Sequence, residues 1–229
     1  MPVQAVILAA GMGTRLGRPW PKPLTPLSDG RTIMQQQIDN LRASFTDPRI
    51  TTVVGFKLEL ILEAFPDVTY VYNEVYDQTN TNRSLMKALR LSAPGGVLWM
   101  NGDVVFDPAV LTRVQSLIDA EQSFICVNTE VVGEEEVKYT VDASGYVDGL
   151  SKQVTNALGE AVGINYVSAS DKPLLIQRLA ECEDLDYFER GVELMIEKDG
   201  AQVVPFDIKD LFAVEVDFEE DLSRANAHL

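Results

Sequence analysis

The chain has 229 residues, a hydrophobic content of 46% and a formal net charge of −16. This length and hydrophobic content suffice for one sizeable core, and we expect a single domain over residues 1–229. The strong negative charge argues against nucleic acid or an anionic membrane surface as a partner.

Three further features restrict the class of protein. The two cysteines, Cys126 and Cys182, stand in apolar contexts, which predicts buried free thiols in a reducing compartment. The only histidine, His228, lies next to the C-terminus, which disfavours histidine-dependent catalysis and the usual zinc sites. No apolar run resembles a signal peptide or reaches the length of a membrane span. We therefore expect a soluble cytoplasmic protein.

The first predicted element is a short buried strand over residues 3–8, which runs into Leu-Ala-Ala-Gly-Met-Gly-Thr-Arg-Leu-Gly at residues 8–17. Gly11 and Gly13 tolerate positive φ and let a ligand approach the backbone, whose N–H groups can form an anion nest. Arg15 and Lys22 add positive charge beside this nest. The combination predicts a nucleoside triphosphate site.

Two common phosphate-binding loops do not fit this segment. A P-loop requires Gly-x-x-x-x-Gly-Lys, but Gly11 and Gly17 are one residue too far apart and Arg18 stands in place of lysine. The dinucleotide fingerprint requires a third glycine where this chain has Leu16. The simplest alternative is a plain glycine turn, but Arg15 and the later Pro-Lys pair favour a phosphate site.

The next elements alternate between helix and strand. Prolines at 19, 21, 23 and 26 predict an extended, non-helical segment. Hydrophobic periodicity then predicts a helix over 31–41, a strand over 50–54, a helix over 58–65 and a strand over 68–72.

The polar stretch over residues 73–83 has two interpretations. It is a loop with a cap for the predicted helix over 84–91, since Asn and Thr are good caps. Alternatively it recognises a base and ribose, because an Asn side chain offers both donors and acceptors to a pyrimidine edge.

Asp103 follows the predicted strand over 96–100. An acidic residue just beyond the carboxyl end of a parallel strand lies at the edge where such sheets bind ligands. Asn-Gly-Asp is also ordinary turn chemistry. We favour a metal ligand, because Mg²⁺ accompanies a triphosphate and takes one or two protein carboxylates with phosphate oxygens.

The second half of the chain is less regular. We expect a helix over 107–120, a strand over 123–127, a β-hairpin formed by 137–141 and 146–150, and a strand over 164–168. Helices over 171–181 and 187–198, strands over 201–205 and 212–216, and a helix from 217 follow. The strand–helix alternation over 3–120 predicts an α/β protein with a doubly wound, mixed, mostly parallel sheet, and the hairpin is an insertion over the sheet's carboxyl edge.

The glycine segment with Pro21-Lys22 resembles the signature of nucleotidyltransferases that activate sugar phosphates and polar-alcohol phosphates. The stretch Thr-Asn-Thr-Asn-Arg-Ser-Leu at 79–85, Gly-Asp at 102–103 and Glu-Val-Asp at 215–217 extend the resemblance. They look most like the cytidylyltransferase branch that acts on phosphocholine and phosphonates. The resemblance implies a Rossmann-like nucleotidyltransferase fold, Mg²⁺ as cofactor, and CTP and a phosphate or phosphonate acceptor as small-molecule partners.

The resemblance also implies catalytic roles. Asp103 and Asp217 would hold Mg²⁺, although Asp217 is alternatively a helix N-cap. Arg15 would clamp the β- and γ-phosphates, and Lys22 would neutralise the α-phosphoryl group and the incoming acceptor. The acceptor's oxygen is already largely anionic near pH 7, so that no general base is needed.

Two sets of binding residues follow. The nucleotide-binding set is Leu8, Ala9, Ala10, Gly11, Gly13, Thr14, Asn80, Asn82, Ser84 and Gly102. The acceptor-binding set is Lys152, Glu160, Tyr187, Glu189 and Glu215, whose acids suit an ammonium-bearing acceptor such as phosphocholine or 2-aminoethylphosphonate. Lys152 and Glu160 are alternatively exposed surface residues, and Tyr187 to Glu189 are alternatively a core aromatic pair with a surface acid.

Two other functions stay open. One is a sugar-1-phosphate nucleotidyltransferase that uses UTP or dTTP, and the other is a catalytically silent nucleotide-binding module. The oligomeric state is open too, with a homodimer as one option.

Overall fold

The computed structural model describes residues 2–13, 15–130, 133 and 136–229. Seven strands form the main path of the central sheet, and all are parallel to one another except β9, which is antiparallel to both neighbours. Their order across the sheet is β10 (Val204–Asp207), β6 (Phe124–Asn128), β9 (Gly159–Val167), β4 (Val97–Asn101), β1 (Gln4–Ala9), β2 (Arg49–Val54) and β3 (Thr69–Tyr72). The predicted mixed, mostly parallel sheet is confirmed.

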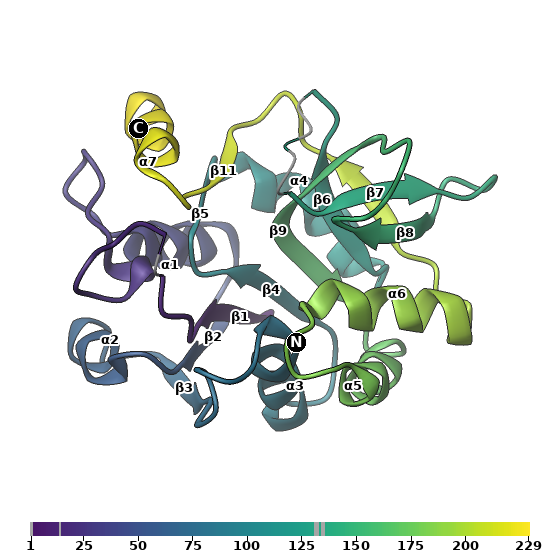
Figure 1. Cartoon of the computed structure of the whole chain (residues 1–229), viewed down its shortest axis with the longest axis horizontal. Helices are drawn as coiled ribbons and strands as arrows, with labels where there is room; N and C mark the ends of the chain where they lie inside the picture. The colour runs from purple at the N-terminus through teal and green to yellow at the C-terminus, as the bar shows by residue number, and fades with distance from the viewer. Residues whose placement is uncertain (1, 14, 131–132, 134–135) are drawn as a thin grey trace.

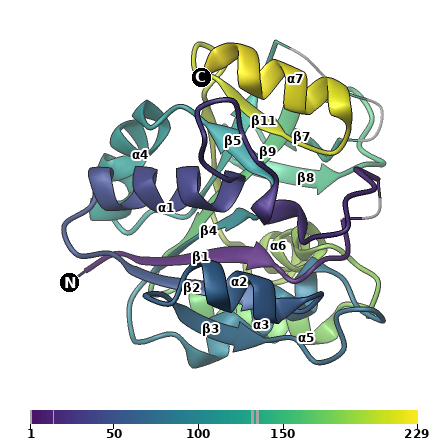
Figure 2. The same ribbon diagram turned by 90° about the vertical axis from the view of Figure 1, so that its left-hand side faces the viewer.

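Helices cover both faces of this sheet (Figures 1 and 2). One face carries α1 (Ile33–Ser44), α2 (Leu58–Ala64) and α4 (Ala109–Asp119), and the other carries α3 (Thr81–Leu91), α5 (Lys172–Glu181) and α6 (Phe188–Asp199). Strand β1 contributes to both cores, because Ala5, Ile7 and Ala9 face the first set while Val6 and Leu8 face the second. Burial on two faces explains why its sequence is an uninterrupted apolar run.

Two smaller β units lie beside the main sheet. The predicted hairpin is present as β7 (Lys138–Val141) and β8 (Val147–Ser151), and β7 pairs with the start of β9. The other unit pairs β11 (Ala213–Glu215) with β5 (Val104–Phe106) in antiparallel orientation, and helix α7 (Glu219–His228) follows β11. Strand β5 was not expected, since three residues are too few to give a periodic pattern.

Several element boundaries differ from the sequence expectation by a few residues; β10, for example, covers 204–207 instead of 201–205. Three other differences lie near the carboxyl edge of the sheet. Helix α3 begins at Thr81 instead of residue 84, because Asn80 caps it by accepting a hydrogen bond from the Thr81 N–H at 2.8 Å. The proline-rich segment contains a short 3₁₀ helix, η1 (Lys22–Leu24), whose early proline needs no N–H partner. Strand β9 already begins at Gly159, before the segment that was expected to be a strand.

The expectation for the two cysteines is confirmed. Cys126 and Cys182 are buried free thiols, as predicted. Within the described ranges, no helix combines the length and the apolar character that crossing a bilayer requires.

Candidate active site

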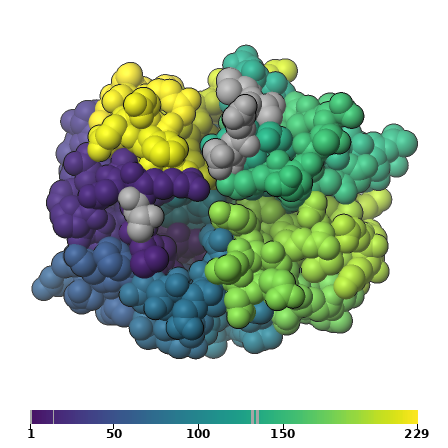
Figure 3. Space-filling view, viewed as in Figure 1, coloured from purple at the N-terminus to yellow at the C-terminus, as the bar shows by residue number. Residues whose placement is uncertain are grey.

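A cavity of about 460 Å³ lies beyond the carboxyl ends of β1 and β4. Its wall combines the glycine segment after β1, the start of α3, residues flanking the hairpin, the start of α6 and the segment from β11 to Asp217. Figure 3 shows this hollow at the centre of one face, between the N-terminal segment, α7 and the second half of the chain. Its position is the one at which open α/β sheets bind their ligands.

The glycine segment approaches η1 closely. Gly13 has φ +59°, and a Cβ on it would lie 3.0 Å from the Cβ of Lys22. Glycine at this position therefore lets the loop turn directly beside the lysine. Gly11, Gly13 and Arg15 line the cavity, whereas the predicted nucleotide ligand Thr14 falls outside the described residues.

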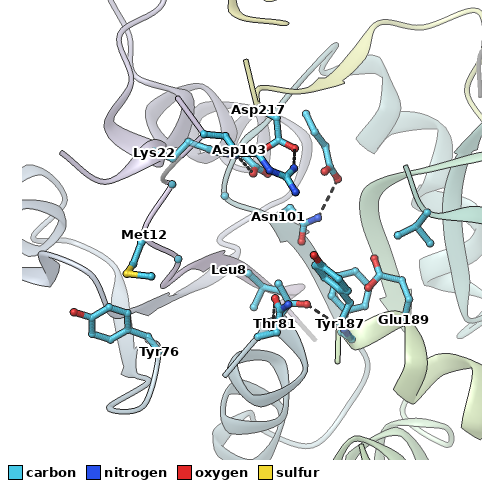
Figure 4. A pocket seen from close by; sticks show the side chains of 18 of the residues that line it. Leu8, Met12, Lys22, Tyr76, Thr81, Asn101, Asp103, Tyr187, Glu189 and Asp217 are labelled. Atoms are coloured by element: carbon cyan, nitrogen blue, oxygen red, sulfur yellow. Dashed lines mark hydrogen bonds and ion pairs between the residues drawn. The ribbon is translucent and has the colours of Figure 1, made fainter. Parts of the chain in front are cut away.

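Lys22 forms the centre of a charge cluster inside the cavity. Its Nζ donates to Asp103 Oδ2 at 2.8 Å and to Asp217 Oδ1 at 2.5 Å. Arg15 adds a second cation, whose guanidinium donates to Asp217 Oδ2 at 2.9 Å. Figure 4 shows Lys22, Asp103 and Asp217 converging at one end of the cavity.

Pairing between two short strands brings the two aspartates together. Strand β11 runs antiparallel to β5, and the Val216 N–H donates to the Asp103 carbonyl at 3.0 Å. Asp103 just before β5 therefore lies beside Asp217 just after β11. Asp221 caps the following helix, because its Oδ2 accepts from the Asp217 and Phe218 N–H groups. The carboxylate of Asp217 is left to face Lys22 and Arg15.

The cluster stabilises its own charged forms. Burial opposes the charge of Lys22, but Asp103 and Asp217 outweigh it and raise the pKa of the ammonium above its ordinary value. Burial also opposes the charge of Asp217, yet Lys22 and Arg15 hold the pKa of this carboxyl below its ordinary value. Both residues therefore carry full charge at neutral pH.

The aspartate pair is chemically suited to a divalent cation. No described group of three or more His, Cys, Asp or Glu side chains is arranged to hold a metal ion. However, Mg²⁺ in a nucleotide site needs only one or two protein carboxylates, since phosphates supply other ligands. Asp103 and Asp217 already share one cation, the Lys22 ammonium, and the buried Asp103 Oδ1 accepts no hydrogen bond from the described residues. These oxygens fit Mg²⁺.

Comparison with known sequences shows which family the chain belongs to. A sequence profile described as the MobA-like NTP transferase domain matches residues 5–162. The chain belongs to this family. The match covers the glycine segment, η1 and Asp103, whereas Asp217 lies beyond it.

Two relatives with known names match about half of this chain each. The chain is 40% identical over 129 residues to "CMP-5'-(3-aminopropyl)phosphonate synthase" of Streptomyces rubellomurinus, which covers 52% of this chain and 20% of the relative. It is 36% identical over 103 residues to "Bifunctional protein GlmU" of Thermotoga maritima, which covers 44% of this chain and 22% of the relative. The chain thus spans about a fifth of the length of these two relatives.

Solved structures share the fold over almost the whole chain. The CTP:phosphocholine cytidylyltransferase of Streptococcus pneumoniae matches with a TM-score of 0.77 and 18% identity, covering 100% of this chain and 99% of that one. The inositol-1-phosphate CTP transferase of T. maritima matches with a TM-score of 0.77 and 15% identity, covering 98% and 96%. Together these likenesses confirm the expected nucleotidyltransferase fold.

Some of the residues expected to bind nucleotide line the cavity, and the others do not. Leu8, Gly11, Gly13, Asn80 and Gly102 line the main cavity. Ala9 lines a smaller, adjoining cavity of about 120 Å³ that shares Leu8 and Lys22 with the main one. These six residues therefore surround one continuous space made of the two adjoining cavities.

The remaining described candidates lie off the cavity walls. The Ala10 carbonyl accepts from the Phe56 N–H, which fixes the turn after β1. Asn82 is fully buried and its Nδ2 donates to the Glu183 carbonyl at 2.6 Å, while Ser84 accepts from Asn73 at 3.1 Å. These side chains hold the loop in place, so that the loop interpretation accounts for them without a ligand.

Four of the five expected acceptor-binding residues line the cavity. These are Lys152, Tyr187, Glu189 and Glu215. The fifth, Glu160, accepts from the Gly133 N–H at 2.8 Å and lies off the wall. Its neighbour Ala161 lines the cavity instead, because adjacent residues of a strand face opposite sides.

The cavity wall that contains Glu189 and Glu215 is acidic and buried. Burial raises the pKa of Glu189 to about 7, and Lys152 partly counteracts this effect. Burial, followed by repulsion from Asp103, raises the pKa of Glu215 well above its ordinary value. The Asn101 amide donates to Glu215 Oε1 at 3.0 Å, and Gly163 leaves the room that this carboxyl occupies.

Several cavity residues were not singled out from the sequence. Met12, Tyr76, Thr81, Asn101 and Glu136 all line the wall. Asn101 immediately precedes the Gly-Asp pair, so that its place at the end of β4 was a usable signal. Glu136 offered none, because it is the last of three consecutive glutamates and belongs to none of the motifs above.

Proposed function

We propose that this chain is a nucleotidyltransferase that transfers CMP from CTP to a small phosphate or phosphonate acceptor and releases pyrophosphate. The observation that carries this proposal is the Lys22 ammonium between Asp103 and Asp217, beside the glycine segment. A buried cation with two metal-competent carboxylates is what transfer at a phosphorus atom requires, since catalysis there consists mainly of positioning and charge neutralisation.

In the proposed reaction, an anionic oxygen of the acceptor forms a bond to the α-phosphorus of CTP. The bond from that phosphorus to the oxygen bridging to the β-phosphate breaks, and its electron pair leaves with pyrophosphate. Lys22 neutralises the α-phosphoryl oxygens and orients the acceptor. Arg15, whose side chain is 44% exposed, is free to move onto the departing phosphates. No side chain has to remove a proton.

Asp103 and Asp217 would hold Mg²⁺, which would supply positive charge to the nucleotide phosphates and polarise the α-phosphoryl group. The chain's own contribution is to keep both aspartates ionised and next to each other. Lys22 and Arg15 do this before nucleotide binds, because they offset the repulsion between the two carboxylates.

Two observations support CTP and an aminated acceptor. The relative from S. rubellomurinus, 40% identical over 129 residues, is named for a CMP-phosphonate product that carries an amine. The cavity wall on the acceptor side contains Tyr187, Glu189 and Glu215, groups that attract an alkylammonium ion. Asn80 and the backbone after β1 are the proposed contacts to the base.

A second candidate is a sugar-1-phosphate nucleotidyltransferase that uses UTP or dTTP. The observation that favours it is the similarity to GlmU proteins, 36% identical over 103 residues in T. maritima. This candidate keeps Lys22, Asp103 and Asp217 in the same roles and changes only the base and the acceptor.

The test is pyrophosphate release with Mg²⁺, in which CTP, UTP, ATP, GTP and dTTP are each combined with phosphocholine, 2-aminoethylphosphonate, inositol phosphate and sugar 1-phosphates. We expect turnover with CTP and an amino-alcohol phosphate or aminophosphonate. Preference for UTP or dTTP with a sugar phosphate would establish the second candidate. Nucleotide binding without turnover of any pair would support the silent-module hypothesis.

A further inference from the structure

One end of the cavity contains hydrogen-bond acceptors that have no donor. Glu189 is only 7% exposed, it lines the cavity, and its Oε2 accepts no hydrogen bond from the described residues. The buried Oδ1 of Asn101, on the same wall, likewise has no donor in the part of the chain that the structure describes. A buried acceptor without a donor destabilises the protein, so that both oxygens favour a ligand with N–H or O–H groups.

The Glu189 carboxyl lies apart from the phosphate-binding charges, and Asn101 lies between the two groups. Figure 4 shows Tyr187 and Glu189 on one side of Asn101, and Lys22, Asp103 and Asp217 on the other. The end with Tyr187 is lined by the carboxyl groups of Glu189, Glu215 and Glu136 and by Lys152. Burial raises the pKa values of these three acids, and a cation bound beside them would favour their ionised forms. A ligand group that binds there should therefore both donate hydrogen bonds and carry positive charge.

We infer that the acceptor carries a primary ammonium group that donates hydrogen bonds to Glu189 and Asn101, and that the site disfavours a quaternary trimethylammonium group. This inference rests on the proposed function and narrows its acceptor class. A primary ammonium has three N–H donors, as the lysine side chain does. A trimethylammonium group has none, so that binding it would leave both oxygens unpaired and still buried.

The aromatic residues of the cavity support the same choice. Proteins recognise quaternary ammonium ions by surrounding them with several aromatic faces. Among the described residues, Tyr187 is the one aromatic ring open to this end, and Lys152 Nζ already lies 5.2 Å from its centroid. Phe188 also lines the cavity, but its ring packs edge-on against Trp99 at a centroid distance of 5.6 Å. These rings do not form an aromatic cage.

The test compares three acceptors that share one phosphonate group: 2-aminoethylphosphonate, its N,N,N-trimethyl analogue and ethylphosphonate. We expect kcat/KM with CTP to be at least about tenfold higher for the primary amine than for the trimethyl analogue, since each lost hydrogen bond to a charged group costs that much. Equal or better turnover of the trimethyl analogue would overturn the inference. This comparison uses the unmodified chain and needs no variant.

A variant pair assigns the effect to Glu189. We expect Glu189→Gln to reduce the preference for 2-aminoethylphosphonate over ethylphosphonate by about tenfold or more, because the charge is lost while the shape is kept. The control is Glu197→Gln on the exposed side of the same helix, which should leave this preference unchanged. An unchanged preference in Glu189→Gln would refute the role of this residue.

A binding measurement separates failure of this inference from failure of the proposed function. If no acceptor reacts with any nucleotide, the proposed function fails. Calorimetric titration of the same acceptors in the presence of α,β-methylene CTP still compares the head groups. Tighter binding of the primary amine supports the inference, whereas equal binding, or no binding of either, overturns it.

Discussion

The two ends of the cavity differ in how their polar groups are satisfied. At the phosphate end, Lys22, Arg15, Asp103 and Asp217 neutralise one another through contacts of 2.5–2.9 Å. At the head-group end, a buried oxygen of Glu189 has no donor among the described residues. Under the proposed function, the charges of the first end would exchange partners when a triphosphate binds. The second end would gain its missing donors from the acceptor.

The largest expected effect comes from removing the central cation of the phosphate end. Lys22→Ala should lower kcat by at least about 10³-fold, because it removes charge neutralisation at the reacting phosphorus and leaves two aspartates facing each other. Pyrophosphate release under saturating substrates measures the loss. Arg18→Ala, at an exposed ion pair with Glu219, is the matched control and should retain activity. Near-normal turnover of Lys22→Ala would sink the assignment.

A smaller but more specific loss is expected at Asp103 and Asp217, the pair proposed to hold Mg²⁺. Asp103→Asn should reduce turnover by about 10²–10³-fold and raise the Mg²⁺ concentration needed for half-maximal rate, because an amide is a weaker ligand than a carboxylate. Mn²⁺ binding followed by electron paramagnetic resonance, with nucleotide present, checks the ligand role independently of activity. Unaltered Mn²⁺ affinity would show that Asp103 is not a ligand.

At the head-group end, removing a charge should stabilise the protein. The pKa of Glu189 rises from 4.5 to about 7 on folding, so that the folded chain keeps a proton that the unfolded chain releases between these values. The folded chain therefore has its full stability below pH 4.5, where Glu189 is protonated in both states. It loses stability as the pH rises through 7, because the buried carboxyl then ionises. Relative to the native chain, Glu189→Gln should gain about 3 kcal/mol between pH 4.5 and 8.

Urea denaturation of both proteins at a series of pH values measures this difference. The half-buried acids Glu136 and Glu160 also have raised pKa values, but both proteins share them and their contribution cancels. Parallel stability curves for the two proteins would show that Glu189 is already ionised in the folded chain.

The features that the sequence predicted correctly are those carried by neighbouring residues in the chain. Gly11, Gly13, Arg15 and Lys22 are close together in the chain, so that a local pattern was enough to indicate a phosphate site. The mostly parallel sheet with helices on both faces followed from the alternation of predicted strands and helices, since two-sided burial gives strands with continuous apolar runs.

What the sequence missed depends on contacts between distant segments. The pairing of β5 with β11 sets the distance between Asp103 and Asp217, yet each strand has only three residues. Glu160 was expected at the acceptor site, but the start of β9 at Gly159 turns it away and presents Ala161. Which of two adjacent strand residues faces the cavity depends on the register of the strand. The sequence pattern around Glu160 does not determine that register.

The smallest expected effect is a pH dependence confined to aminated acceptors. With a pKa of about 7, Glu189 is mostly protonated at pH 6 and ionised at pH 8, whereas an alkylammonium stays charged throughout. The ratio of kcat/KM for 2-aminoethylphosphonate over ethylphosphonate should therefore rise about tenfold from pH 6 to 8. Using this ratio removes the titration of the phosphonate group, which both acceptors share.

The charged groups that act on Glu189 are Lys152, Glu193 and Glu215. Lys152 favours the ionised form and the two acids oppose it, so that Lys152→Met should shift the rise in this ratio to higher pH. Glu189→Gln should abolish the rise.

If the ratio stays flat in the native chain but the primary amine is still preferred over its trimethyl analogue, Glu189 is ionised at pH 6 and the preference comes from hydrogen bonding alone. A ratio that falls with pH would contradict an anionic partner for the ammonium at this end of the cavity.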